Sequence, residues 1–282
     1  MGKCLACQLN CFYYGIKKNI PGVNKEGTEY TADSGWFDSD KIRFRKGRPE
    51  KIGGWEKYST STFLGVSRSL HDWASLESIR YIGIGTHLKF YINQGTSYHD
   101  ITPLRATTSA GDVTFAATDG SSIITATDTA HDSGVNDFVT FSGSASLGGT
   151  ITAAVINQEY QIASVPTANT FTFIAKDSDG DAVTANSSDS GNGGSSVVGA
   201  YQISVGLNVY LEGTGWGAET WGSGTFGSVS ALSSGSQLRL YSQDNFGEDL
   251  IFNVRGGGVY YWDESAGTSA RAVPLTSLAG QS

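Results

Sequence analysis

The segment "IRYIGIGTHLKFYI" (79–92) decides the fold class, because its pattern predicts two apolar β-strands joined by a turn. "FLGVSRSLHDW" (63–73) precedes it and "SYHDITPL" (97–104) follows it, and both have the composition of further strands. Strands this close in sequence pair as an antiparallel meander. The stretch from 63 to 104 therefore predicts one small antiparallel unit.

A related layout returns near the end of the chain. "IFNVRGGGVYYW" (251–262) is again a strand, a Gly-rich turn and an aromatic strand, and it is flanked by "LRLYSQD" (238–244) and "ARAVPL" (270–275). Two copies of a unit of about 40 residues are typical of β-propeller blades. The alternative is two ordinary hairpins that share common turn residues. Three identities recur at an offset of 171 positions: Arg68 with Arg239, Pro103 with Pro274, and Leu104 with Leu275.

The region between the two copies has a different composition. Residues 106–205 are rich in Thr, Ser, Ala, Gly and Asp, and "SSDSGNGGSS" (187–196) inside them has the composition of a flexible loop. Candidate strands occupy 122–128, 137–143, 159–165, 170–176 and 197–203. Short strands at this spacing predict a small β-barrel or sandwich inserted between two blades. The expected divisions of this all-β protein are an irregular arm (1–35), a first propeller-like unit (36–105), the inserted domain (106–205), and a Trp-Gly repeat with a second propeller-like unit (206–282).

Charge is unevenly distributed along the chain. Residues 1–105 contain 15 Lys and Arg against 10 Asp and Glu, whereas residues 106–282 contain 4 against 17. This asymmetry indicates two different neighbours. No apolar run approaches the ~20 residues needed to span a bilayer, and no signal-peptide pattern opens the chain. We therefore expect that the protein does not insert into a membrane. We expect that it is assembled in a bacterial cytoplasm.

A basic run opens the expected first blade. If this run is a strand, alternate residues share a face, so 41, 43 and 45 point to one side and Ile42 and Phe44 to the other. Such a row of cations could contact nucleic-acid phosphates without reading sequence. The alternative is a solvated face paired with nearby carboxylates and neighbouring subunits. The candidates for contact with nucleic acid or for a subunit interface are Lys41, Arg43, Arg45, Lys46, Arg48 and Lys51.

Three aromatic residues, each followed by Gly, stand five positions apart in "WGAETWGSGTFG": Trp216, Trp221 and Phe226. An odd spacing places successive rings on opposite sides of a straight strand, so the Gly residues more naturally bend the chain to let each ring pack. Stacking against carbohydrate is the alternative. These residues are candidates for aromatic packing or glycan contact.

The sequence offers no cofactor, metal or catalytic signature. Cys4, Cys7 and Cys11 lack a nearby fourth ligand, and "DSDGD" (177–181) departs from a calcium loop and more simply predicts a turn. The four His residues are scattered, and no P-loop or G-x-S-x-G motif occurs. We therefore expect no metal, no cofactor, no catalytic residue and no enzyme activity.

Several strings resemble a large family of bacteriophage virion proteins: "DSDKIRFRKGRPEKIGGWEKY", "RSLHDW", "YIGIGTHLKFY", "HDITPLR", "DTAHDSGVNDFVTFSG", "NQEYQIASVPTANTFTF", "GTGWGAETWGSGTFG" and "LRLYSQDNFGEDLIFNVRGGGVYYWD". The resemblance is to the nozzle or tail-tube class of short-tailed phages. It implies a β-propeller core and a sixfold ring around a DNA channel. Members of the family continue past the position of Ser282, and two blades cannot close a propeller. The sequence is then either a fragment or a short version completed by another subunit.

The resemblance implies a structural component of the phage tail, located in the virion, that forms part of the DNA ejection conduit. Its implied partners are copies of itself in a ring (a hexamer is the natural expectation), other tail proteins such as adaptor and fibres, and phage DNA in transient contact. One alternative is a receptor-binding or fibre-anchoring tail module that contacts host surface glycan. Another is a secreted hydrolase built on a propeller.

Overall fold

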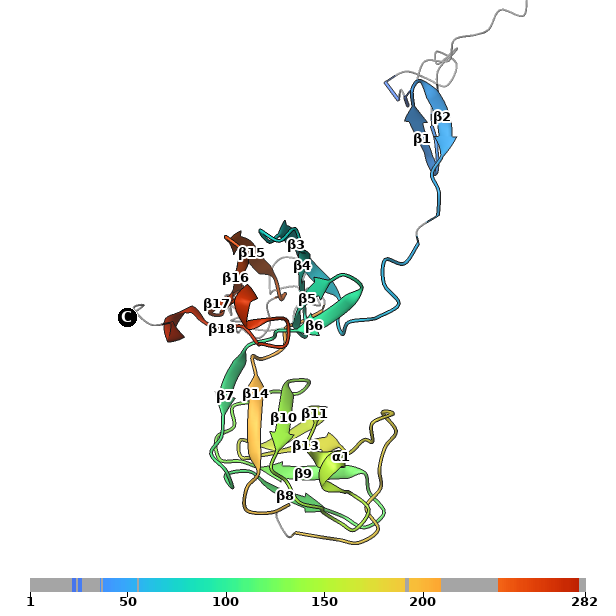
Figure 1. Ribbon diagram of the computed structural model, residues 1–282. Helices are drawn as coiled ribbons and strands as arrows, with labels where there is room; N and C mark the ends of the chain where they lie inside the picture. The colour runs from blue at the N-terminus through green and yellow to red at the C-terminus, as the bar shows by residue number, and fades with distance from the viewer. Residues whose placement is uncertain are drawn as a thin grey trace, which may run out of the picture. The chain divides into compact units, whose positions relative to one another are not determined.

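The protein is nearly all β. A computed structural model describes residues 22–23, 25–26, 36, 38–54, 56–190, 193–208 and 238–278. The chain forms two compact units, residues 1–58 and 59–282. The described residues form five antiparallel sheets (Figure 1). The predicted all-β class is confirmed. Of the expected arm (1–35), only residues 22, 23, 25 and 26 are among the described ones.

The first unit contains a hairpin of β1 (Ile42–Arg45) and β2 (Arg48–Lys51). Lys46 and Gly47 join the two strands, with φ of 49° and 77°. Positive φ at both central residues is the geometry of a type I′ turn, whose twist matches that of the flanking strands. Pro49 lies within β2, opposite Phe44.

Two four-stranded meanders make up the propeller-like part of the second unit, and both are visible in Figure 1. Their strands pair in sequence order, as in a propeller blade. Blade 1 consists of β3 (Ser67–Ala74), β4 (Arg80–Thr86), β5 (Phe90–Gln94) and β6 (Ser97–Asp100). Blade 2 consists of β15 (Tyr241–Phe246), β16 (Asp249–Val254), β17 (Val259–Trp262) and β18 (Val273–Pro274), with 3₁₀ turns at Glu264–Ala266 and Leu275–Ser277.

The two blades share one hydrophobic core. The rings of Phe90 and Phe252 stack with centroids 3.9 Å apart and an interplanar angle of 10°. Trp262 meets Trp73 and Tyr81 edge-on, at 6.5 and 5.7 Å. All five rings are buried. Aromatic pairs in these geometries add to the stabilisation that burial alone provides.

Hydrogen bonds surround this core. The Tyr81 hydroxyl donates to Glu264 Oε1 at 2.7 Å, and the Tyr241 hydroxyl donates to the Thr86 carbonyl at 2.8 Å. Burial, together with the bond to Glu264, raises the pKa of Tyr81 to about 12, so its hydroxyl keeps its proton at physiological pH. The two sheets are thereby held in one relative position.

Glycine in β4 permits the close approach of the blades. A Cβ on Gly85 would lie 2.4 Å from Tyr241 Cδ2, and one on Gly83 would lie 2.5 Å from Gln243 Oε1. A side chain at Gly85 would collide with the Tyr241 ring, and one at Gly83 would require the end of the Gln243 side chain to move. The "IGIG" string is therefore a packing requirement as well as a strand.

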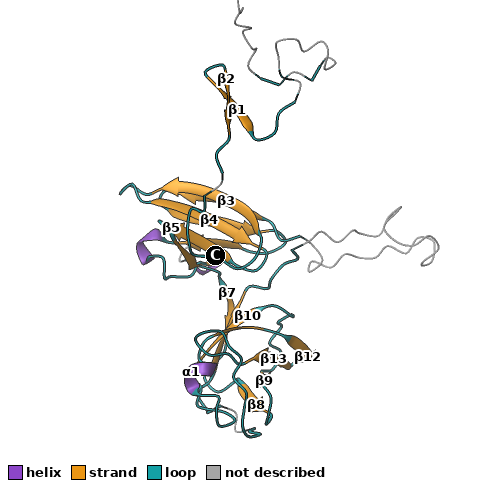
Figure 2. Ribbon diagram, turned by 90° about the vertical axis from the view of Figure 1, so that its right-hand side faces the viewer, coloured by secondary structure: helices purple, strands orange, loops and turns teal. Residues whose placement is uncertain are grey.

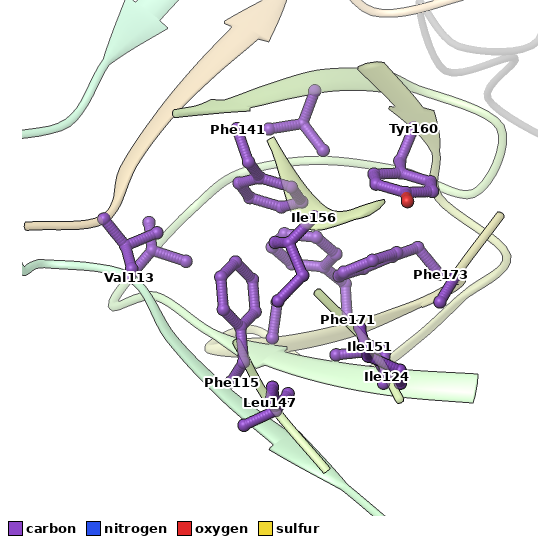
Figure 3. Close-up of a cluster of buried hydrophobic side chains, with 14 of the residues drawn as sticks. Val113, Phe115, Ile124, Phe141, Leu147, Ile151, Ile156, Tyr160, Phe171 and Phe173 are labelled. Carbon is purple, nitrogen blue, oxygen red and sulfur yellow. The ribbon is translucent and has the colours of Figure 1, made fainter. Parts of the chain in front are cut away.

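The inserted domain is a sandwich of two four-stranded sheets, ordered β11-β10-β14-β7 and β12-β13-β9-β8. Its core contains rings from both sheets, including Phe115, Phe141, Tyr160 and Phe173 (Figure 3). Of the two expected architectures, the sandwich is observed. The elements are β7 (Leu104–Thr107), β8 (Thr114–Ala117), β9 (Ile123–Thr127), β10 (Phe138–Ser142), α1 (Ala153–Ile156), β11 (Glu159–Gln161), β12 (Ser164–Thr167), β13 (Thr170–Ile174) and β14 (Val198–Gln202), with α1 coloured separately in Figure 2.

The sequence patterns did not predict three of these elements: β7, β8 and α1. β7 (LRAT) and β8 (TFAA) are only four residues long and each has a single large apolar side chain, so neither shows a clear alternation of apolar and polar residues. The predicted flexible loop at 187–196 is also tethered at one point. Asp189 and Ala117 exchange backbone hydrogen bonds of 2.8 and 3.0 Å, so this part of the loop extends the second sheet.

We expect Gly85→Ala to lower the free energy of unfolding of the second unit by about 1–3 kcal/mol, because the new methyl group would push Tyr241 away from blade 1. Urea denaturation followed by Trp fluorescence measures this. Gly134→Ala is the control, because a Cβ there meets only Asp137 Oδ2, at 3.8 Å. Equal stability of the two variants would contradict a tight approach of Tyr241 to Gly85.

Candidate functional site

The basic hairpin presents its cations mainly on one face. In β1, Ile42 and Phe44 are half-buried while Arg43 and Arg45 are exposed, as alternation predicts. In the observed register, Arg48 lies opposite Arg45, so both arginines project from the same face. Three guanidinium groups therefore lie close together, with the Glu50 carboxylate as the acidic group on that face.

Two of the six cations have an ion-pair partner nearby. Arg43 Nε lies 3.2 Å from Glu50 Oε2, and Lys41 Nζ lies 3.7 Å from Asp40 Oδ2. These side chains are about half exposed or more, so water and salt screen the pairs strongly. Within the described residues, Arg45, Lys46, Arg48 and Lys51 form no ion pair. The hairpin therefore keeps a net positive surface.

Lys51 differs from the other cations in its orientation. It lies opposite Ile42, so it belongs to the face that carries Phe44. Trp36 packs edge-on against Phe44 with ring centroids 6.0 Å apart. The structure thus separates an apolar face, at whose border Lys51 stands, from an arginine face.

The other residues singled out from the sequence do not belong to the basic hairpin. Trp216, Trp221 and Phe226 lie outside the described residues, as do Cys4, Cys7 and Cys11. "DSDGD" is confirmed as a turn: Asp177 Oδ1 accepts hydrogen bonds from the amides of Asp179 and Asp181, at 3.0 and 2.9 Å. In the part of the chain that the structure describes, no cluster of His, Cys, Asp or Glu could hold a metal, and no helix is long and apolar enough to cross a membrane.

A buried cluster of charges that sequence reasoning missed joins the two blades to the inserted domain. Lys89 is 3% exposed, and its Nζ lies 2.7 Å from Asp100 Oδ2 and also bonds Glu159 of the sandwich. Arg271 of blade 2 reaches the same two carboxylates, at 3.5 Å each. Lys89 Nζ also lies 4.5 Å from the centroid of the Phe138 ring. Two cations and two anions thus neutralise one another.

The electrostatics of this cluster favour ionised carboxylates. Burial by itself would raise the pKa of Asp100, but the charges of Lys89 and Arg271 and hydrogen bonds from Lys89 and Thr102 outweigh it and hold this pKa below its ordinary value. Because the four charges balance and are largely enclosed, the arrangement is suited to fixing neighbouring parts of the chain. A signal was present in the sequence, since Arg271 is one of only four cations after residue 105.

Lys89→Met should lower the free energy of unfolding by about 3–5 kcal/mol, because Asp100 and Glu159 would face each other with Arg271 as their one remaining cation in the cluster. Thermal or urea unfolding measures the loss. The matched control is Lys176→Met, at an exposed position, with an expected change within about 0.5 kcal/mol. Similar stabilities for the two variants would contradict a structural role for the cluster.

Comparisons with known proteins give little guidance. No protein-family model and no curated protein matches the chain. Among solved structures, it is similar to the phage phi92 endosialidase, with 14% sequence identity and a TM-score of 0.26. The alignment covers 80% of this chain but only 32% of that protein's length. A likeness at this level carries no argument about function.

Proposed function

We propose that this protein is a structural component of a bacteriophage tail, where it forms part of the nozzle or tail-tube conduit for DNA. One observation carries the proposal: the strings that resemble the phage virion family coincide with structural elements. "RSLHDW" lies in β3, "YIGIGTHLKFY" spans β4 and β5, and "HDITPLR" runs from β6 into β7. The resemblance therefore follows a blade and its junction with the insert.

The shape of the blade pair supports an assembled state. Among the described residues, blades 1 and 2 pack against each other through one face of each sheet, whereas a blade within a closed propeller has a neighbouring blade on both faces. The outer face of blade 2 carries a cross-strand row of Ile251, Tyr261 and Val273, and Val273 is 40% exposed. Copies of this chain in a ring, which we take to be a hexamer, and other tail proteins such as adaptor and fibres are the partners that would cover such faces.

The basic hairpin supports a place beside DNA. Arg45 and Arg48 of its arginine face form no ion pair within the described residues, and a ring would repeat these charges around the channel. Exposed guanidinium groups contact phosphates regardless of base sequence. Such contact is weak at physiological salt, which suits DNA that must pass through. The work of this protein is then assembly and guidance in the virion rather than catalysis.

Cryo-electron microscopy of purified particles tests the proposal. We expect this chain in a ring at the tail, with residues 41–51 closest to the axis. Density on the capsid surface or at fibre tips would overturn the proposal that this chain forms part of the conduit. It would favour decoration of the capsid in the first case and receptor binding in the second.

A solution measurement tests DNA binding by the hairpin separately. For the assembled ring, the affinity for duplex DNA of arbitrary sequence should fall steeply as salt rises. Replacing Arg45, Lys46 and Arg48 with Gln should reduce the slope of log K against log salt by about 0.9 for each phosphate that the variant no longer neutralises. Lys176→Gln in the sandwich is the control. An unchanged slope in the triple variant would show that the hairpin does not touch DNA.

A further inference from the structure

We propose that a pocket beside blade 2 binds a small organic oxyanion of the size and kind of an acidic sugar. The pocket has a volume of about 380 Å³. It lies where β7 and the segment after β14 meet the turn between β16 and β17. A volume of this order suits a single small molecule.

Three arginines line the pocket, namely Arg105, Arg239 and Arg255, and none of the described residues that line it is acidic. This is an uneven use of charge, because residues 105–282 contain only five Lys and Arg against 17 Asp and Glu. Three of the five cations of an acidic region therefore contribute to the lining of one cavity. Planar guanidinium groups match carboxylate and phosphate oxygens, so the lining selects for an anion.

Arg105 is held in place by the sandwich. Its guanidinium donates to the carbonyls of Asp132 and His131, at 2.6 and 3.1 Å, and to the Ser133 hydroxyl at 2.8 Å. The side chain of Asp132, 3.4 Å away, is 95% exposed, so solvent weakens that pairing. The guanidinium is thus oriented chiefly by neutral acceptors.

Arg239 is positioned in the same way. It donates to the Ser204 carbonyl, and its side chain crosses Gly206, where a Cβ would lie 2.5 Å from its Nε. Its charge also acts on Tyr260: burial raises the pKa of this phenol, and Arg239 works against that rise. Among the described residues, neither Arg239 nor the exposed Arg255 forms an ion pair. Two positive charges thus stand at the cavity without a carboxylate partner in the described chain.

Much of the remaining lining is apolar. Tyr260 contributes an aromatic ring that is tilted against Phe252 at 5.5 Å, and Leu104, Val254 and Pro274 contribute aliphatic surface. A bare inorganic anion would leave this surface unused. A ligand with an oxyanion on one side and a C–H-rich ring on the other would use both parts, and an acidic sugar has that character.

Titration calorimetry on the full chain tests the proposal with four probes: glucuronate, glucose 1-phosphate, neutral glucose and inorganic phosphate. We expect the two acidic sugars to bind, glucose to bind at least about tenfold more weakly, and the affinity for the acidic sugars to fall as salt rises. Phosphate binding as tight as the acidic sugars would overturn the role of the apolar lining. No binding of either acidic sugar at roughly 20 mM, well above the dissociation constant of a millimolar ligand, would overturn the site itself.

Variants locate the site. Arg255→Gln should weaken acidic-sugar binding about tenfold or more while leaving the melting temperature unchanged, because this exposed side chain forms no ion pair in the described chain. Gly206→Ala should weaken binding by displacing Arg239. The control is Arg80→Gln, at an exposed arginine that opens β4. Equal affinity in all three variants would overturn the assignment. These measurements do not require an assembled ring, so their outcome does not depend on whether the protein forms part of a DNA conduit.

Discussion

The close approach of two β-sheets at β4 is the constraint on which the rest of the second unit depends. Gly83 and Gly85 remove side chains where Gln243 and Tyr241 must lie, and this brings Phe90 and Phe252 into stacking contact. Neither blade could bury its aromatic face alone, because a single meander has an apolar face open to water. The two halves of the propeller-like part therefore stabilise each other although the inserted domain separates them in sequence.

The inserted domain is compatible with this pairing because the chain enters it through β7 and leaves it through β14, and these two strands are neighbours. β7 and β14 pair antiparallel, and the Ile203 amide donates to the Pro103 carbonyl at 3.1 Å. The sandwich has its own core, distinct from the core between the blades. Between the two lies a charged cluster of Lys89, with its two carboxylate partners and Arg271. Charged groups in such a place orient parts of a chain more specifically than apolar contact does, because each requires a partner in one position.

Charge, rather than catalytic geometry, distinguishes the surfaces of this molecule. The arginine face of the hairpin is solvated and suited to phosphates of any sequence. The second unit is acidic overall, and five of its eight Lys and Arg residues lie in the buried cluster or line the pocket beside blade 2. The two cationic regions differ in form, since one is a convex hairpin and the other a cavity with an aromatic wall. They are therefore suited to different partners.

The sequence by itself determined the all-β class, the two related meanders, the presence of an inserted β domain and the alternation of β1, because strand periodicity and turn residues act over a few positions. It did not reveal β7 or β8, because four residues with one large apolar side chain each give little pattern. Only the tertiary structure chose the sandwich over the barrel. It also brought Lys89 to Glu159 and Arg239 to Arg105, because these contacts join segments that lie far apart in the sequence and depend on how whole sheets pack.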